Sequence, residues 1–340
     1  MTIKIGIIGA GNIGTAMATL IAQSSAQVHV AARGARLSDI VENGTSLNDR
    51  GIQFSARPIA LTTITEPMDA IFVCVKSQSL ASALLVNAAA ITPDTLVIPM
   101  INGMPFWFNA TKDGIGSVPF LDPKGELANL LDPRQILGAV LLMTVRMDET
   151  GCAISSNTPT LSIGPIVNGS DTDRIETLLQ VLETGGLRAD LCADIRQKVL
   201  VKLLANVATN PLTALTGAML NDVGTKPALR EVALKLADEF RDWARHAGYD
   251  LPSNDWLVDL FVDAGDFPTS MLQDAIAGRT LELDAICKAP LEMARRAGGD
   301  MPFLSHLITE IETAATLPAR PDQIPNALSR LFTLSEFSEG

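Results

Sequence analysis

The chain has 340 residues, of which 47% are apolar and 19% charged, and its formal net charge is −12 at pH 7. These values are typical of a soluble globular protein that is long enough for two domains. The acidic balance excludes nucleic acid and anionic membranes as general partners, because both select clustered Lys and Arg. No stretch reaches the ~18 uncharged apolar residues that a membrane span needs.

The N-terminus predicts a dinucleotide-binding fold. A buried strand is predicted for IKIGII (3–8), and it leads directly into the motif Gly9-Ala10-Gly11-Asn12-Ile13-Gly14, which a predicted helix follows. In this context the first glycine would make the tight turn, the second would let the backbone approach the pyrophosphate, and the third would allow close helix packing. The helix N-terminus would then offer N–H groups to the phosphates. A tight turn without a ligand is the alternative reading.

The end of the next predicted strand, VHVAA (28–32), indicates which cofactor is used. An NAD-preferring site carries an Asp or Glu about 20 residues beyond the glycines. Arg33 stands there instead, with Arg36 close behind and no acidic residue before Asp39. A guanidinium suits a 2′-phosphate, so the sequence favours NADP(H) over NAD(H). A solvated surface arginine is the alternative.

Two further strands, AIFVCVK (70–76) and TLVIPMIN (95–102), have a helical stretch between them, which predicts a parallel doubly wound sheet. Ligands bind outside the carboxyl ends of such strands, where Lys76 and Asn102 are placed. A turn at Asn102-Gly103 is a rival interpretation. The segment 104–132 is irregular and carries an aromatic cluster (Phe106, Trp107, Phe108), and loops of this length are often functional or mobile.

After about residue 190 the pattern becomes helical, which divides the chain into a Rossmann-type domain over 1–190 and a helical domain over 191–330. In KVLVKLLANVATNPLTAL (198–215), Lys202, Asn206 and Asn210 share one stripe of a mostly apolar helix. Buried ammonium and amide groups are costly unless paired, so the stripe predicts a site. A partly exposed polar face is the alternative, and Lys198 on the same stripe is a rival for any role of the lysine.

Two residue types narrow the chemistry. The three histidines lie outside these motifs, so a lysine whose pKa is lowered by burial is the candidate proton donor. The four cysteines are far apart without a CxxC pair, which predicts a reduced cytoplasmic protein without a metal site. The N-terminus enters the glycine motif without a basic leader, so no signal peptide is predicted. The same helix is expected to end or kink at Pro211.

With the glycine motif, Arg33, Lys76, Asn102, KLLANVATNPLTAL, SMLQD (270–274) and Glu282 in order, the chain resembles the ketopantoate reductases (2-dehydropantoate 2-reductases). The resemblance implies NADPH-dependent reduction of ketopantoate to pantoate, a step of pantothenate biosynthesis, with Lys202 as the proton donor. It implies that Gly9 to Gly14, Arg33 and Lys76 bind the cofactor and that Asn102 lies between nicotinamide and substrate. The remaining implied roles are substrate binding by Asn206, Asn210 and Ser270 and binding of cofactor hydroxyls by Glu282.

Some positions depart from the family pattern. Phe267 replaces an Asn, Cys287-Lys288 replaces an Asn-Gly pair, and Leu220 stands where a polar contact is expected. Together with the longer aromatic segment 104–132, these departures favour a changed substrate, because a lost hydrogen bond to a hydroxyl alters selectivity strongly.

Two alternatives to ketopantoate reduction stay open. One is a related dehydrogenase acting on another 2-keto or 2-hydroxy acid or an opine. The other is a non-catalytic NADPH-binding regulator, against which the joint presence of Lys202, Asn206, Asn210, Ser270 and Glu282 argues. The Ala- and Leu-rich helical domain is a candidate surface for a homodimer.

Overall fold

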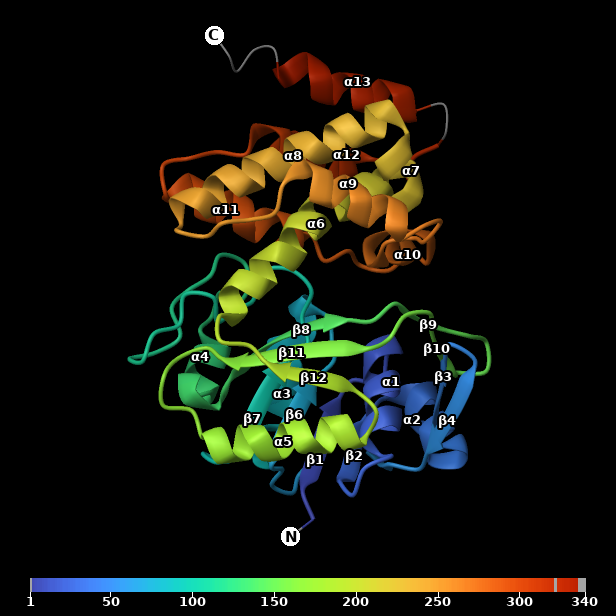
Figure 1. Ribbon diagram of the computed structural model, residues 1–340, viewed down its shortest axis with the longest axis vertical. Coiled ribbons are helices and arrows are strands. Elements are labelled where there is room, and N and C mark those ends of the chain that lie inside the picture. The colour runs from blue at the N-terminus through green and yellow to red at the C-terminus, as the bar shows by residue number, and fades with distance from the viewer. Residues whose placement is uncertain (1, 321–322, 336–340) are drawn as a thin grey trace. The chain divides into compact units, whose positions relative to one another are not determined.

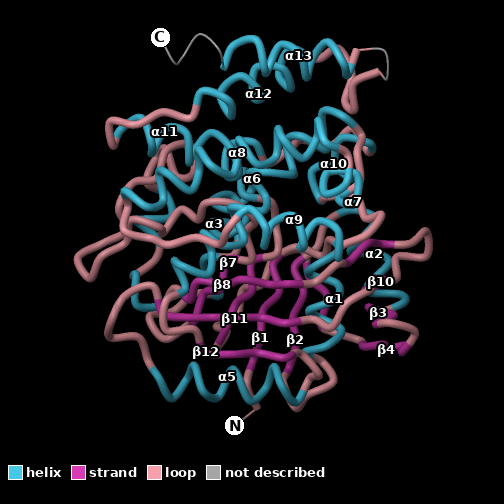
Figure 2. The backbone as a smooth tube through the Cα atoms, turned by 45° about the horizontal axis from the view of Figure 1, so that its top comes forward, coloured by secondary structure: helices cyan, strands magenta, loops and turns pink. Residues whose placement is uncertain are grey.

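The computed structural model describes residues 2–320 and 323–335 (Figure 1). The chain forms two compact units. Unit 1 consists of Met1–Ile101, Phe106–Ser117 and Asp122–Arg196, and unit 2 consists of Asn102–Pro105, Val118–Leu121 and Gln197–Gly340. Figure 2 shows that the strands of the described chain belong to unit 1, whereas unit 2 is built from helices.

The main sheet of unit 1 has five parallel strands in the order β5-β2-β1-β6-β7. Its inner strands are Ile- and Val-rich and almost fully buried, as expected for a sheet covered on both faces. The order reverses between β1 and β6, which is the switch point where ligands bind in such sheets. This topology confirms the predicted parallel doubly wound sheet. The strands are β1 (Lys4–Ile8), β2 (Gln27–Ala31), β5 (Ile59–Leu61), β6 (Ala70–Val73) and β7 (Leu96–Pro99).

Two smaller sheets complete unit 1, in the orders β4-β3-β10-β9 and β12-β11-β8. The sequence pattern does not indicate the sheet around β3, because its strands are short and partly polar. Helix α5 lies along β12 (Figures 1 and 2). The strands are β3 (Thr45–Asp49), β4 (Ile52–Ala56), β8 (Leu137–Leu142), β9 (Val145–Met147), β10 (Ala153–Ser155), β11 (Thr160–Pro165) and β12 (Arg188–Leu191). The helices are α1 (Asn12–Ile21), α2 (Gly34–Asn43), α3 (Leu80–Val86), α4 (Glu126–Leu130) and α5 (Thr172–Thr184), with short turns at Ser77–Ser79, Ala88–Ala90 and Pro133–Gln135.

The aromatic cluster in the segment 104–132 is part of a core. Phe106 and Trp107 are each 1% exposed and Phe108 is 7% exposed. The Arg196 guanidinium donates to the carbonyls of Phe108, Ala110 and Ile166 at 2.8–2.9 Å, and it lies 5.9 Å from the centre of the Trp107 ring. These three side chains therefore pack inside unit 1, while the contribution of the segment 104–132 to substrate selectivity stays a prediction.

Unit 2 consists of helices and one π-helical turn, which confirms the predicted helical second part. Helix α6 was expected to end or kink at Pro211, and it continues past this residue, so it does not end there. Within the described ranges it is the one helix with the length and hydropathy to cross a membrane, but 72% of that window is buried, as in the core helix of a folded unit. The elements are α6 (Ile195–Thr216), α7 (Leu220–Thr225), α8 (Pro227–His246), α9 (Asn254–Asp263), α10 (Ser270–Ile276), η4 (Asp284–Lys288), α11 (Ala289–Arg296), α12 (Pro302–Thr313) and α13 (Ile324–Ser335).

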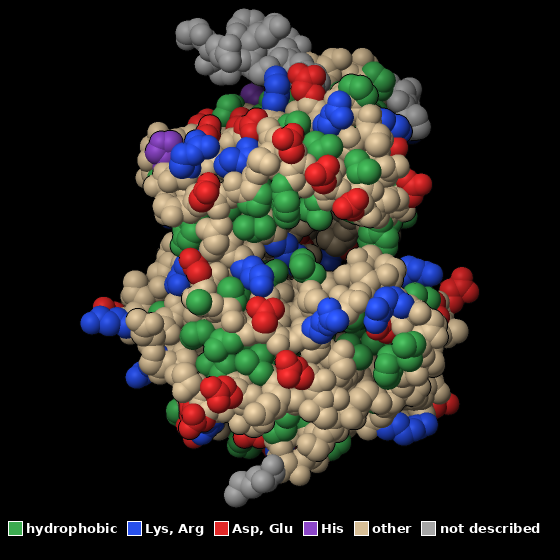
Figure 3. Space-filling view, viewed as in Figure 1, with side chains coloured by type: hydrophobic (Ala, Val, Ile, Leu, Met, Phe, Trp, Pro, Cys, Tyr) green, Lys and Arg blue, Asp and Glu red, His purple; other side chains and the backbone are tan. Residues whose placement is uncertain are grey.

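The surface agrees with the acidic composition. On the face shown in Figure 3, acidic and basic side chains are interspersed over both units, and the basic ones form no continuous patch there. This distribution fits a protein whose ligands are small molecules rather than nucleic acid.

Candidate active site

The predicted cofactor-binding residues of unit 1 lie at the carboxyl ends of the strands of the main sheet. The glycine motif follows β1, Arg33 follows β2, and Lys76 follows β6 closely. Because these strands are parallel neighbours, their carboxyl ends share an edge, and that edge includes the switch point between β1 and β6. The fold thus brings to the same end of the sheet three groups that are spread over more than sixty residues of the sequence.

The glycines of the motif have different roles. Gly9 has φ = +99°, and a Cβ there would lie 2.8 Å from the Cys74 carbonyl oxygen; a Cβ on Gly14 would lie 1.8 Å from the Gly9 oxygen. Packing within the protein therefore requires both of these glycines. Gly11 is exposed, and a Cβ there would have no heavy atom within 4 Å. Open space at the start of a helix is what a bound pyrophosphate needs in this class of fold.

The residues between these glycines support the loop. Asn12 begins α1, and its side-chain amide donates to the Val145 carbonyl at 3.3 Å, while Ala10 and Ile13 are partly buried. The Asn12 side chain thus holds the loop in place, and the backbone N–H groups at the helix start are what the loop can offer to phosphates.

Arg36 is a residue of this edge whose role the sequence analysis missed. Its Nε donates to the Ala10 carbonyl at 3.3 Å, its Nη2 donates to the Thr15 hydroxyl at 2.9 Å, and it also pairs with Asp39. These bonds attach Arg36 to the glycine loop itself. Arg33, in contrast, is exposed at the start of α2, where its guanidinium can meet an anionic group from solvent.

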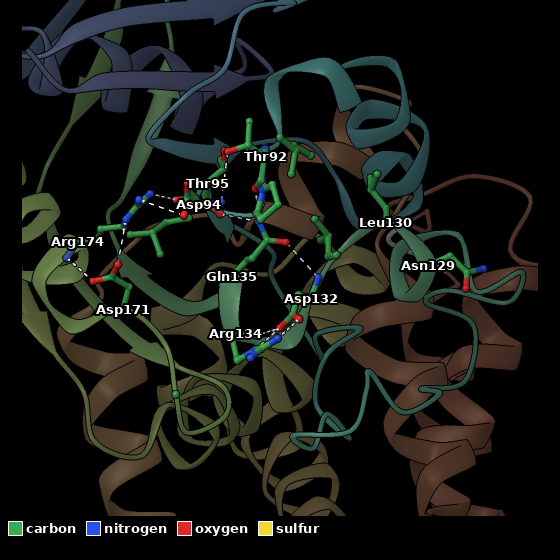
Figure 4. Close-up of a pocket in the computed structure, with 15 residues that line it drawn as sticks. Thr92, Asp94, Thr95, Asn129, Leu130, Asp132, Arg134, Gln135, Asp171 and Arg174 are labelled. Carbon is green, nitrogen blue, oxygen red and sulfur yellow. Dashed lines mark hydrogen bonds and ion pairs between the residues drawn. The ribbon is translucent and has the colours of Figure 1, made fainter.

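A cavity of about 590 Å³ lies at the other end of the main sheet, where the strands have their amino ends (Figure 4). Its wall includes residues 91–96, which precede β7 and so belong to the amino end of that strand. Its two arginines are paired with carboxylates: Arg134 with Asp132 at 2.7 Å, and Arg174 with Asp171 at 3.0 Å. This cavity is distinct from the cofactor edge, and its cations are already neutralised.

In unit 2, the polar stripe of α6 presents hydrogen-bond donors. Lys202 and Asn206 are partly buried, and Asn210 is 3% exposed. The Nδ2 groups of Asn206 and Asn210 are buried and have no hydrogen-bond partner among the described residues. A buried donor without a partner costs about 1–3 kcal/mol, so these amides fit a ligand rich in acceptor oxygens. A carboxylate or a keto group has that chemistry.

The environment of Lys202 suits a proton donor. Burial lowers the pKa of Lys202 to about 8, while the charge of Glu282 acts in the opposite direction. An ammonium with this pKa is still mainly protonated at neutral pH but releases its proton readily. The charge of Glu282 favours the ammonium form and so opposes part of the effect of burial.

Asn102 is held beside the segment that carries Glu282. The Met104 N–H donates to the Ala285 carbonyl at 2.7 Å, and a Cβ on Gly103 would lie 2.7 Å from the same carbonyl. Gly103 also has φ = +97°, so both its conformation and its packing require glycine. Ala285 belongs to the π-helical turn η4, which starts two residues after Glu282, and such turns are frequent at functional sites.

The remaining candidates are a predicted substrate-binding residue, Ser270, and the three histidines. Ser270 is exposed at the start of α10, and its neighbour Thr269 caps that helix by accepting from the Leu272 N–H at 3.2 Å. His29 is fully buried in β2, where burial lowers its pKa. His246 and His306 lie on α8 and α12. Lys202 is thus the titratable group of the described stripe whose pKa burial lowers toward neutrality.

The fold and these two groups of residues define an oxidoreductase of the dinucleotide-binding class with a helical second unit. Comparison with known proteins identifies the family. Models described as "Ketopantoate reductase PanE/ApbA" and "Ketopantoate reductase PanE/ApbA C terminal" match residues 5–166 and 194–314. The chain belongs to the ketopantoate reductase family, whose members are nicotinamide-dependent reductases.

Individual relatives agree with this assignment. A 2-dehydropantoate 2-reductase from Mesorhizobium japonicum is 29% identical over 92% of this chain and 98% of its own length. A candidate ketopantoate reductase from Ralstonia solanacearum MolK2 has a TM-score of 0.84 and 26% identity, covering 92% of this chain and 97% of that one. D-mandelate dehydrogenase, solved with NADH and anilino(oxo)acetate, shares the fold with a TM-score of 0.78 and 20% identity, covering 91% and 97%.

The lysine environment generates a prediction that needs no assumption about the reaction. Competitive acetylation of lysines across pH, quantified by mass spectrometry, should show Lys202 half-reactive near pH 8, because only the neutral amine reacts. The Glu282→Gln variant should lower that midpoint further, since it removes the charge that favours the ammonium. Lys288 provides the internal control, because its hydrogen bond to Glu312 raises its pKa. A Lys202 midpoint at the ordinary value of about 10.4 would contradict the assignment.

Proposed function

We propose that the protein is an NADPH-dependent 2-keto acid reductase that converts ketopantoate to pantoate. The observation that carries the proposal is the stripe of α6, where a lysine of lowered pKa stands on the same face as two buried amides without partners. This arrangement suits an anion that also carries a carbonyl to be protonated. Four free cysteines agree with the cytoplasmic location that forms part of the proposal.

The cofactor half of the proposal rests on the edge of the main sheet. Bound NADPH would supply the hydride. The N–H groups at the start of α1 and the open space at Gly11 fit its pyrophosphate, and the exposed Arg33 fits its 2′-phosphate. Arg36 would keep the loop in its binding conformation through Ala10 and Thr15. Lys76, at the end of β6, is assigned a contact with the cofactor.

The substrate half rests on unit 2. Asn206 and Asn210 would donate hydrogen bonds to substrate oxygens and fix the orientation of the keto acid, a large part of such catalysis. Lys202 would transfer a proton from Nζ to the carbonyl oxygen as the adjacent carbon is reduced, which gives the neutral 2-hydroxy group. Glu282 would keep Lys202 protonated and bind cofactor hydroxyls, and Ser270 and Asn102 would complete the contacts to the substrate.

A second candidate substrate class is favoured by two positions. The Leu220 N–H donates to the Phe267 carbonyl at 3.1 Å, so two apolar replacements in the family pattern lie side by side. A wall with fewer polar groups would accept a 2-keto acid with an apolar side chain. A purely regulatory role is disfavoured, because binding NADPH does not require two unpaired amides and a lysine of lowered pKa on one helix face.

The first test concerns the proton donor. Lys202→Ala should lower kcat/KM for NADPH-dependent reduction of ketopantoate by at least about tenfold, or ~1.4 kcal/mol, because general acids contribute 10²–10⁴-fold. Lys198→Ala, one turn earlier on the same helix, is the matched control and should stay near wild type. A smaller loss for Lys202→Ala than tenfold, or an equal loss for both variants, would remove Lys202 as the acid.

The second test concerns the cofactor. The wild type should use NADPH with a clearly higher kcat/KM than NADH. Arg33→Ala should reduce the value for NADPH by about tenfold and leave that for NADH nearly unchanged, since only NADPH carries the 2′-phosphate. Arg57→Ala is the control, because Arg57 is exposed and bonded to the Glu42 carbonyl. Equal use of both cofactors by the wild type would refute this part of the proposal.

The third test concerns the substrate. In a panel of 2-keto acids with NADPH, benzoylformate or 2-ketoisocaproate should rival ketopantoate for the wild type. Phe267→Asn should move the ratio of kcat/KM values toward ketopantoate by about tenfold, because an amide can bond to its hydroxyl. A wild type that strongly prefers ketopantoate would show that Phe267 does not set selectivity.

A further inference from the structure

A chain of buried hydrogen bonds links helix α6 to helix α10. The hydroxyl of Thr213 donates to the Asn210 carbonyl at 3.2 Å and lies 2.6 Å from the hydroxyl of Thr269. The Thr269 hydroxyl accepts from the Leu272 N–H at 3.2 Å. Thr213 is 0% exposed and Thr269 is 6% exposed, so both hydroxyls are shielded from water.

The number of protons that each hydroxyl can donate sets the direction of these hydrogen bonds. Each hydroxyl has one proton to donate. The proton of Thr213 goes to the Asn210 carbonyl, so the proton of Thr269 must lie between the two hydroxyls and point to Thr213. A lone pair of Thr269 remains for the Leu272 N–H. Each hydroxyl therefore donates once and accepts once, and replacing either one leaves its buried partner unsatisfied.

The two ends of the chain adjoin groups of the proposed substrate site. Asn210 carries one of the buried amides without a partner, and Ser270 directly follows Thr269 at the start of α10. The Thr213 hydroxyl gives the Asn210 carbonyl a side-chain donor from the same helix and thereby ties it to the chain of hydroxyls.

We propose that Thr213 and Thr269 are positioning residues that set the location of Asn210 relative to Ser270 and so determine the affinity for the 2-keto acid. This inference rests on the proposed function. Neither threonine contacts the substrate in this scheme; each acts through the residue it holds. Small displacements of an oriented group reduce catalysis and binding strongly, which makes a short and buried linkage between the two helices consequential.

The test uses substitutions that separate shape from hydrogen bonding. Thr213→Val and Thr269→Val keep the side-chain shape and remove the hydroxyl, whereas Thr213→Ser and Thr269→Ser keep the hydroxyl. Each valine variant should raise KM for the 2-keto acid by about tenfold, with the Kd for NADPH unchanged in a fluorescence titration, and each serine variant should restore KM. The double valine variant should be no worse than one single variant, because both break the same chain.

Thr216→Val is the matched control, since the Thr216 hydroxyl donates to Leu212 within the same helix and does not reach α10. A merely structural role would lower Tm without changing KM in the valine variants, and that result would overturn the inference. Because the two positions are tested separately, failure of one variant to fold leaves the other decisive. A wild type that reduces no 2-keto acid would instead overturn the proposed function, and the positioning role with it.

Discussion

The site depends on the cost of placing an ammonium group in a desolvated position. Burial lowers the pKa of Lys202, and a lysine that became neutral could not act as the proposed proton donor. The charge of Glu282 offsets part of that effect, and the resulting pKa of about 8 is near the pH at which a metabolic enzyme works. The position of Glu282 therefore matters as much as that of the lysine. The fold of unit 2 must keep helix α6 and the segment that carries Glu282 in a constant relative position.

The π-helical turn η4 explains how Asn102 is kept close to the segment that carries Glu282. A carbonyl in this turn accepts from the Met104 N–H, and the close approach at Gly103 leaves no room for a side chain. The loop after β7 is thus fixed to the element that begins just after Glu282. An Asn-Gly pair in a sequence reads first as a turn, but here the glycine serves packing against another backbone, which only the three-dimensional contact reveals.

Local sequence patterns were sufficient to predict the features that depend on the spacing and hydrophobicity of neighbouring residues. The glycine motif, the buried strands and the stripe on α6 follow from spacing and hydrophobicity, and the sequence predicted them. The role of Arg36 could not be predicted, because it depends on the path of a loop twenty residues earlier. The burial of Trp107 could not be predicted either, because Arg196, which contacts its ring and the Phe108 carbonyl, comes from a distant part of the sequence. The small sheet around β3 was missed because its short strands carry a weak pattern.

In the proposed function, chemistry and selectivity depend on different elements of unit 2, and this separation has a physical basis. The lysine and the amides lie on the long helix α6, whose other faces are buried among apolar side chains and so tolerate little change. Phe267 lies in the short connection between α9 and α10, and Leu220 is the first residue of α7, so neither side chain belongs to the middle of a helix. The neighbouring Thr269 belongs to both parts, because it starts α10 and reaches α6 through Thr213. A chain of this family can therefore alter the side chain that it accepts while the distance between the amides and the lysine, both on one helix, stays constant.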